Sequence, residues 1–154
     1  MKHRWAALVF VLALGALVPK TVAAQGAPPP PPRPSAQTSP GFELGQNFPN
    51  PFNPVTTIPF SIGDPPNCTD TNRTYHVTLR IYNVLAQLVA IPVLQSGDGA
   101  TGQPVVNLTL RCGAYTAFWN GTYLNTSQIV PSGVYLYQIR VEGRSVARKM
   151  IVLR

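Results

Sequence analysis

The stretch that decides the fold is HVTLRIY, residues 76–82. Its apolar residues Val77, Leu79 and Ile81 alternate with polar or amphipathic residues. Successive side chains of a β-strand point to opposite faces, so a period of two indicates a strand that buries one face. This stretch therefore predicts a half-buried strand.

Outward from this stretch, short apolar runs separated by Gly, Pro, Asn, Asp and Ser predict further strands and no helix. The seven expected strands are residues 56–62, 76–82, 88–94, 106–110, 115–119, 135–141 and 147–153. Pro92 lies inside one of them, and this favours a position at the edge of a sheet because proline donates no ladder hydrogen bond. The fold class predicted for residues 42–154 is all-β, an immunoglobulin-like β-sandwich of about seven strands.

Residues 1–24 have the layout of a secretory signal peptide, with a charged start at 2–4, an apolar stretch at 5–18 and small residues before cleavage after Ala24. A retained membrane anchor is the alternative, although the apolar stretch is shorter than the ~20 residues of an ordinary span. The expected location is outside the inner membrane, in the periplasm and then on the cell surface or in the medium.

Residues 25–41 are rich in proline and predict an extended linker, since they hold too little apolar surface to fold. Docking to a proline-reading domain is the alternative. The next stretch, QNFPNPFNP at 46–54, predicts an N-terminal clasp that joins the linker to the sandwich, with Phe48 and Phe52 as buried anchors. The clasp residues are Asn47, Phe48, Pro49, Asn50, Pro51, Phe52, Asn53 and Pro54; the asparagines are expected to bond to local backbone at each bend.

Cys68 and Cys112 are the two cysteines of the chain. An exported chain meets an oxidising compartment, so the pair is expected to form a disulfide that staples the domain rather than a reactive site.

The charge of the chain is +7, and removal of the signal peptide leaves 9 basic and 5 acidic residues, a net charge of +4. Five cations fall in the last fifteen residues: Arg140, Arg144, Arg148, Lys149 and Arg154. They indicate either contact with an acidic partner or membrane surface, or a strand edge protected from pairing with other chains.

The residues that enzymes need are scarce. His76 is the one histidine outside the signal peptide and lies on the outward phase of its strand, and the five acidic residues are scattered. No nucleophile motif, metal-ligand spacing or phosphate-binding loop is present. We therefore predict no enzyme, no cofactor or metal and no small-molecule substrate. The aromatic residues alternate with apolar rather than basic partners, so we predict no nucleic-acid partner.

Several separated stretches resemble one module in the right order. They are residues 44–60 (LGQNFPNPFNPVTTIPF), 77–87 (VTLRIYNVLAQ), 119–121 (WNG), 130–137 (VPSGVYLY) and 149–154 (KMIVLR). Together they resemble the type A C-terminal sorting domain of bacterial type IX secretion substrates, which is similar to the immunoglobulin-like domain of flagellar hook-capping proteins. One departure is Ala86, which stands where the family usually has a glycine in a tight turn.

The resemblance implies a role as an address read by the outer-membrane type IX translocon, often with cleavage by a sortase-like peptidase. The residues that match the family's signal-bearing segments are Gly133, Val134, Tyr135, Lys149, Met150, Ile151, Val152, Leu153 and Arg154. We expect the last strand to be an edge strand that is open to β-addition by a partner, and we expect removal of residues 149–154 to leave the fold largely intact.

Two other interpretations of the function stay open. One is a structural or adhesive immunoglobulin-like module of the periplasm or cell surface. The other is the remnant of a larger secreted protein, because sorting domains of this family follow a cargo and here the proline-rich linker alone separates the signal peptide from the sandwich.

Overall fold

The computed structural model describes residues 41–96 and 100–154. The expected signal peptide, nearly all of the expected linker and part of the glycine-rich loop at 97–102 lie outside the described residues. The described residues contain strands and turns but no helix, and therefore no helix long and apolar enough to cross a membrane.

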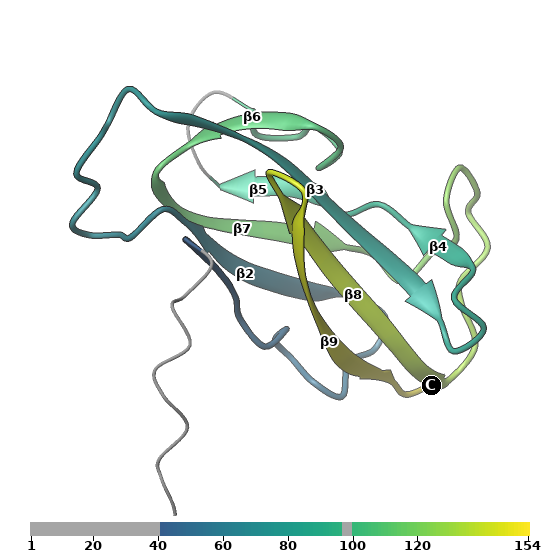
Figure 1. Ribbon diagram of the computed structural model, residues 1–154. Helices are drawn as coiled ribbons and strands as arrows, with labels where there is room; N and C mark the ends of the chain where they lie inside the picture. Colours follow the sequence, from purple (N-terminus) through teal and green to yellow (C-terminus); the bar gives the residue numbers. More distant parts are fainter. Residues whose placement is uncertain (1–40, 97–99) are drawn as a thin grey trace, which may run out of the picture. The chain divides into compact units, whose positions relative to one another are not determined.

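The described residues form nine strands in two antiparallel sheets, which pack face to face as a β-sandwich (Figure 1). In chain order they are β1 (Phe42–Leu44), β2 (Thr56–Ile62), β3 (Thr74–Asn83), β4 (Leu88–Ala90), β5 (Val93–Ser96), β6 (Leu108–Arg111), β7 (Gly113–Trp119), β8 (Gly133–Val141) and β9 (Arg144–Val152). The first sheet, called sheet A, has the order β1-β2-β7-β5. The second, sheet B, has the order β4-β3-β8-β9, with β6 also paired to β3.

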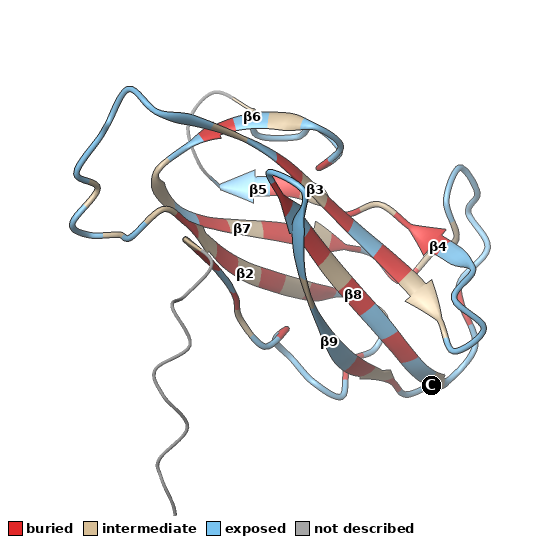
Figure 2. Cartoon of the chain, in the orientation of Figure 1, coloured by how far each residue is buried: buried red, intermediate tan, exposed pale blue. Residues whose placement is uncertain are grey.

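The period-two pattern sets which side chains form the core, as the alternating bands along β3 and β8 in Figure 2 show. Val77, Leu79 and Ile81 of β3 are fully buried between the sheets. The same holds for Tyr137 and Ile139 of β8, while the residues between them face outward. The prediction of an all-β fold from this alternation is confirmed.

The prediction of a single strand at 88–94 is wrong. The segment is broken at Ile91–Pro92, and its halves belong to different sheets: β4 pairs with β3 in sheet B, and β5 pairs with β7 in sheet A. Proline cannot continue a ladder on both sides, so the chain crosses between the sheets there. Both halves lie at sheet edges, which agrees with the position predicted from Pro92.

The expected strand at 106–110 also needs correction. Asn107 has a φ of 47° and its neighbour Val106 is 41% exposed, so the strand begins at Leu108. Val105 is instead the buried residue of this segment. Its N–H donates to the Pro92 carbonyl, and its own carbonyl accepts from Leu79, so this residue links the connection between the sheets to β3.

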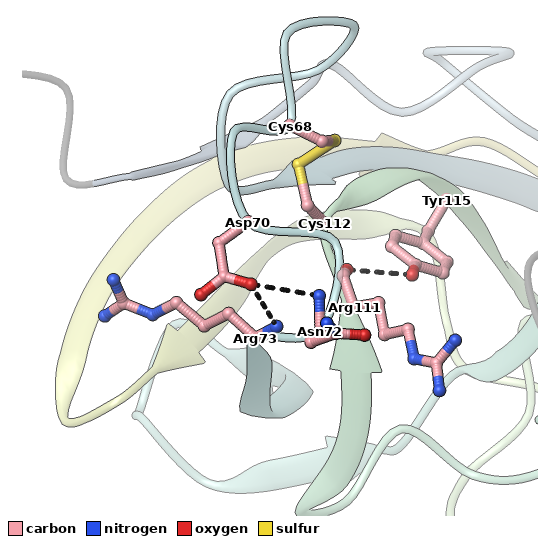
Figure 3. Close-up of a disulfide and its surroundings, with 7 residues drawn as sticks. All are labelled: Cys68, Asp70, Asn72, Arg73, Arg111, Cys112 and Tyr115. Carbon is pink, nitrogen blue, oxygen red and sulfur yellow. Dashed lines mark hydrogen bonds between the residues drawn. A yellow bond between two sulfur atoms is a disulfide. The ribbon is translucent and has the colours of Figure 1, made fainter.

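The disulfide between Cys68 and Cys112 is present and fixes the loop after β2 to the start of β7 (Figure 3). The sulfur atoms are 2.04 Å apart and the cysteines are separated by 44 positions in sequence. Nearby, the Asp70 carboxylate accepts from the N–H groups of Asn72 and Arg73 and closes the turn that leads into β3. The predicted staple is therefore confirmed, in a region that would otherwise be a long open loop.

Candidate functional site

The two segments in which the sequence predicts a sorting signal lie side by side in sheet B. In the β8–β9 ladder Gly133 is opposite Val152, Val134 is opposite Ile151, and Tyr135 is opposite Met150. Two segments more than ten positions apart in sequence are therefore neighbours in the folded chain. They lie near the C-terminus, which Figure 1 marks beside the start of β8.

Alternation divides these residues between core and surface. Tyr135, Met150 and Val152 are at most 5% exposed and pack in the core, whereas Val134 and Leu153 are 45% and 54% exposed. Lys149 and Arg154 are also exposed. The expectation that removal of residues 149–154 leaves the fold largely intact therefore conflicts with the packing, because the deletion would take two side chains out of the core.

Tyr135, one of the predicted signal residues, has a structural role in the core. Its hydroxyl donates to the Pro131 carbonyl over 3.0 Å, and its ring meets Trp119 edge-on at 5.9 Å between centroids. Burial, and to a smaller extent the neighbouring Tyr123, raises the pKa of the Tyr135 phenol. By contrast, Gly133 has an ordinary φ, and a Cβ there would first meet the Tyr135 ring at 3.8 Å. The backbone therefore does not require glycine at position 133.

The clasp covers the outer edge of β9. The Phe52 N–H donates to the Ile151 carbonyl, and the Leu153 N–H donates to the Phe52 carbonyl, each over 3.0 Å. The Asn50 side-chain oxygen accepts from the Ile151 N–H over 2.9 Å, and the Gln46 amide donates to the Lys149 carbonyl over 3.2 Å.

β9 is an edge strand of sheet B, as expected, but the expectation that its edge is open is wrong for its C-terminal half. Four backbone groups on this side of β9 are bonded to the clasp: the Lys149 carbonyl, the Ile151 N–H and carbonyl, and the Leu153 N–H. A partner that adds a strand at this place must first displace the clasp. The side chains on the outer face of the sheet are not covered in this way.

Within the clasp the two phenylalanines behave differently. Phe52 is 2% exposed and meets Trp119 edge-on at 5.5 Å between ring centroids, so it is the anchor that was predicted. Phe48 is 77% exposed, which contradicts its predicted burial. Its backbone pairs with Thr57 of β2 in both directions, so Phe48 is held by its main chain and its ring faces outward.

The asparagines of the clasp also differ from one another. Asn47 is 2% exposed, and its amide donates to the Pro49 carbonyl and to the Thr56 hydroxyl, which is the local bonding expected. The Asn50 side chain instead bonds to Ile151 of β9, which is distant in sequence. For the Asn53 side chain, no hydrogen bond is found among the described residues. The bonds of Asn47 and Asn50 hold the clasp both to itself and to the last strand.

The turn WNG at residues 119–121 holds the end of the clasp. Gly121 has a φ of +74°, and a Cβ there would overlap the carbonyl oxygen of Pro54. The Trp119 indole N–H donates to the Thr122 carbonyl over 3.0 Å, which fixes the ring beneath Phe52. Glycine is needed at position 121 because of both the positive φ and the close approach of the clasp.

Beside the signal-matching strands, exposed apolar side chains gather at one end of sheet B. We call this surface the apolar end; it consists of Val84, Leu85, Leu88, Val134, Leu136 and Leu153, each at least 40% exposed. The residues are brought together because the end of β3 pairs with the start of β8, which in turn pairs with the end of β9. Six of the eleven large hydrophobic side chains exposed among the described residues belong to it, so exposed apolar surface is concentrated here.

Sequence reasoning missed most of the apolar end. Leu136 and Leu88 were on the outward phase of predicted strands, so alternation alone could have identified them. Val84 and Leu85 lie in the turn between β3 and β4, where the Asn83 side chain accepts from the N–H groups of Leu85 and Gln87. Val84 and Leu85 are two large apolar residues side by side in a predicted turn, and this pattern could have indicated an exposed apolar surface.

That turn has, at Ala86, a backbone conformation that glycine adopts more easily than alanine. Ala86 has a φ of 59°, in the left-handed region, and its N–H donates to the Asn83 carbonyl. The departure from glycine is therefore tolerated, with the strain that an L-residue carries in this region.

The arrangement groups exposed apolar and cationic side chains at one end of sheet B. No group of three or more His, Cys, Asp or Glu side chains that could hold a metal ion occurs in the part of the chain that the structure describes. His76 is exposed, and its backbone N–H donates to the Glu142 carboxylate. What lies together is apolar surface, cations at the end of β9 and a strand edge occupied by the clasp.

Comparisons of the chain with protein-family models, with curated proteins and with solved structures found no match.

Proposed function

We propose that the described domain is a non-catalytic, exported immunoglobulin-like module that acts as a C-terminal sorting signal for type IX secretion and delivery to the cell surface. The observation that carries the proposal is the pairing of Gly133–Tyr135 with residues 150–152 in one ladder. The two segments that resemble the family's signal are thereby joined, and their exposed residues Val134 and Leu153 belong to the apolar end.

Two tyrosines support the immunoglobulin-like assignment within this proposal. The hydroxyls of Tyr115 and Tyr135 each donate to the backbone carbonyl four positions earlier, at Arg111 and Pro131. Such a bond is the tyrosine corner that recurs in immunoglobulin-like sandwiches. The division of the strands into two antiparallel sheets of four and five strands supports the same class.

In this proposal the translocon reads side chains rather than a free strand edge. The clasp already bonds backbone groups of Lys149, Ile151 and Leu153 on the edge of β9, whereas the side chains of Val134 and Leu153 are accessible. Apolar side chains grouped on one surface are the usual centre of a protein interface, and the cations Lys149 and Arg154 lie at its border. Glycine at position 133, which the backbone does not require, lets a partner approach closely. A sortase-like peptidase is the second proposed partner.

The proposal is tested by fusing residues 41–154 to the C-terminus of an exported reporter and expressing it in a host with and without the type IX translocon. Delivery of the reporter to the cell surface in the first host alone is expected. Equal retention in the periplasm of both hosts would overturn the proposal, and would leave the structural or adhesive module as the function of this fold.

A further inference from the structure

A polar hollow of about 390 Å³ lies on the outer face of sheet B. The residues that define its chemistry are Thr78, Arg80, Tyr82, Asn107, Gln138 and Arg140. Ligand sites of proteins commonly have volumes of roughly 300–1,000 Å³, so the hollow has the size of a site for a small ligand. It belongs to neither the clasp nor the pairing of the two signal-matching segments.

The antiparallel ladder between β3 and β8 builds the floor of the hollow. Thr78 is opposite Arg140, and Arg80 is opposite Gln138, so the two arginines are diagonal neighbours on one face. All four residues are on the phase that faces away from the core, because Leu79 and Ile139 between them are fully buried. Diagonal neighbours are about 7–8 Å apart at the backbone, within reach of one ligand for side chains as long as arginine.

Asn107 forms a wall of the hollow because its backbone is fixed in the left-handed region. Its φ is 47°, and its N–H donates to the Thr78 hydroxyl over 2.9 Å. This bond holds the segment before β6 against the outer face of β3. The amide of Asn107 and the amide of Gln138 both line the hollow, and each can donate and accept hydrogen bonds.

The charges of the hollow are not balanced. Arg80 and Arg140 are both exposed, and among the described residues neither has a carboxylate oxygen within 4.0 Å of its guanidinium. Like charges on neighbouring strands repel one another and destabilise a sheet. An anion placed between the two guanidinium groups would remove the repulsion and accept charge-assisted hydrogen bonds.

We propose that this hollow binds a negatively charged sugar. The guanidinium groups of Arg80 and Arg140 would hold its carboxylate or phosphate, since arginine matches both groups with parallel hydrogen bonds. The Tyr82 ring supplies a flat apolar surface for a sugar ring, and the amides of Gln138 and Asn107 supply partners for its hydroxyls. The proposal does not depend on the sorting function.

A single-stranded nucleic acid fits the hollow less well. Such ligands are held by several aromatic side chains in a row along a basic groove. Here Tyr82 is the one aromatic residue that lines the hollow, and the neighbouring outward position on β8 is Leu136. A bounded site with one ring and several amides favours a short sugar.

The test is calorimetric titration of the purified protein with trigalacturonate, with glucose 6-phosphate and with neutral maltotriose. The first two probes separate a carboxylate from a phosphate as the anionic group. We expect at least one of them to bind, with affinity that falls as salt rises because the contacts are ionic, and we expect maltotriose not to bind. Binding of neither anionic sugar, or equal binding of maltotriose, would overturn the proposal.

Two double variants test the site itself. Arg80→Gln/Arg140→Gln should weaken binding by about tenfold or more. Arg111→Gln/Arg154→Gln removes the same charge from exposed positions outside the hollow and should change affinity by less than roughly twofold. Equal loss in both variants would mean that net charge alone attracts the sugar, and would overturn the site.

Tyr82→Leu tests whether the ligand is a sugar and not merely an anion. Loss of the ring should lower the affinity for the sugar probe and leave the affinity for inorganic phosphate unchanged. An unchanged affinity for the sugar would contradict the part assigned to Tyr82 and with it the proposed ligand. Near-ultraviolet circular dichroism of each variant checks that the sandwich is intact.

Discussion

Phe52 lies alongside Val152 as a parallel β-bridge, so the start of the domain is bonded to its last strand. The N–H of Phe52 donates to Ile151, and its carbonyl accepts from Leu153. A segment that looks inert in sequence therefore completes the edge of sheet B. Under the proposed sorting function, a partner that recognises the C-terminus would contact exposed side chains or displace the clasp.

The two phenylalanines of the clasp should differ in their effect on stability. Phe52→Ala removes a ring that is 2% exposed and packed on Trp119, so it should lower the free energy of unfolding by about 3–5 kcal/mol. Phe48→Ala removes a ring that is 77% exposed and should change it by less than about 0.5 kcal/mol. Urea unfolding measures both, and equal losses would contradict the placement of the clasp.

Ala86→Gly should stabilise the domain. Ala86 has a φ of 59°, and an L-residue in the left-handed region costs roughly 1–2 kcal/mol, part of which glycine loses again through its flexible unfolded state. We expect a net gain of about 1 kcal/mol in the free energy of unfolding. The matched control is Ala147→Gly in β9, which should destabilise by roughly 0.5–1 kcal/mol. If both substitutions destabilised the domain, the claim that Ala86 is strained would be refuted.

Loss of the disulfide should cost more than any surface change. Cys68 and Cys112 are 44 positions apart, and closing a loop of this length contributes about 4 kcal/mol in the chain-entropy model. Cys68→Ser/Cys112→Ser should therefore lower the free energy of unfolding by about that amount. A reductant should have the same effect on the wild-type protein and none on the variant. Indifference of the wild type to reductant would contradict a structural bridge.

Stability should fall at alkaline pH through Tyr137. Burial raises the pKa of its phenol, while the backbone N–H of Asn47 and the charge of Arg148 act in the opposite direction and are smaller. Because the pKa in the folded state lies above the unfolded value near 10.0, the contribution is complete below pH 10 and is lost as the pH rises through the folded pKa.

Tyr137→Phe provides the comparison for this effect. The Tyr137 hydroxyl donates to the Gly45 carbonyl over 2.8 Å and accepts from Asn47 over 3.0 Å. The variant should be less stable by about 1–3 kcal/mol at pH 7. Chemical denaturation from pH 7 to 11 should then show the difference shrinking above pH 10. A difference that stays constant over this range would rule out Tyr137 as the titrating group.

The alternation of Val77, Leu79 and Ile81 predicted the core correctly because side-chain direction in a strand depends only on local geometry. Pairing between strands is not local, and two expectations failed for that reason. The break at Pro92 becomes a change of sheet only once both partners, β3 and β7, are in place. The exposure of Phe48 follows from a backbone bridge to Thr57.

The candidate site could be predicted only in part. The motif residues Gly133–Tyr135 and 149–154 identified the two strands, but nothing in their sequence indicates that Asn50 and Phe52 cover the edge of β9. Nor does alternation tell which outward residues will be neighbours. Arg80 and Arg140 share a hollow because of the register between β3 and β8, which the sequence pattern leaves undetermined.

The measurement that tests the central claim most directly is surface delivery of two reporter fusions. One carries the wild-type domain, and the other carries the domain with Val134→Ser/Leu153→Ser. These side chains are 45% and 54% exposed, so the variant should fold normally. The control is Val106→Ser, which removes an apolar side chain of 41% exposure from the segment before β6, outside the apolar end.

In a host that has the type IX translocon, the wild-type domain and the control should bring the reporter to the surface, and Val134→Ser/Leu153→Ser should reduce delivery by about tenfold. In a host without the translocon, all three fusions should stay in the periplasm. Equal delivery of all three fusions, or delivery that does not depend on the translocon, would contradict the proposal that this surface is the sorting signal.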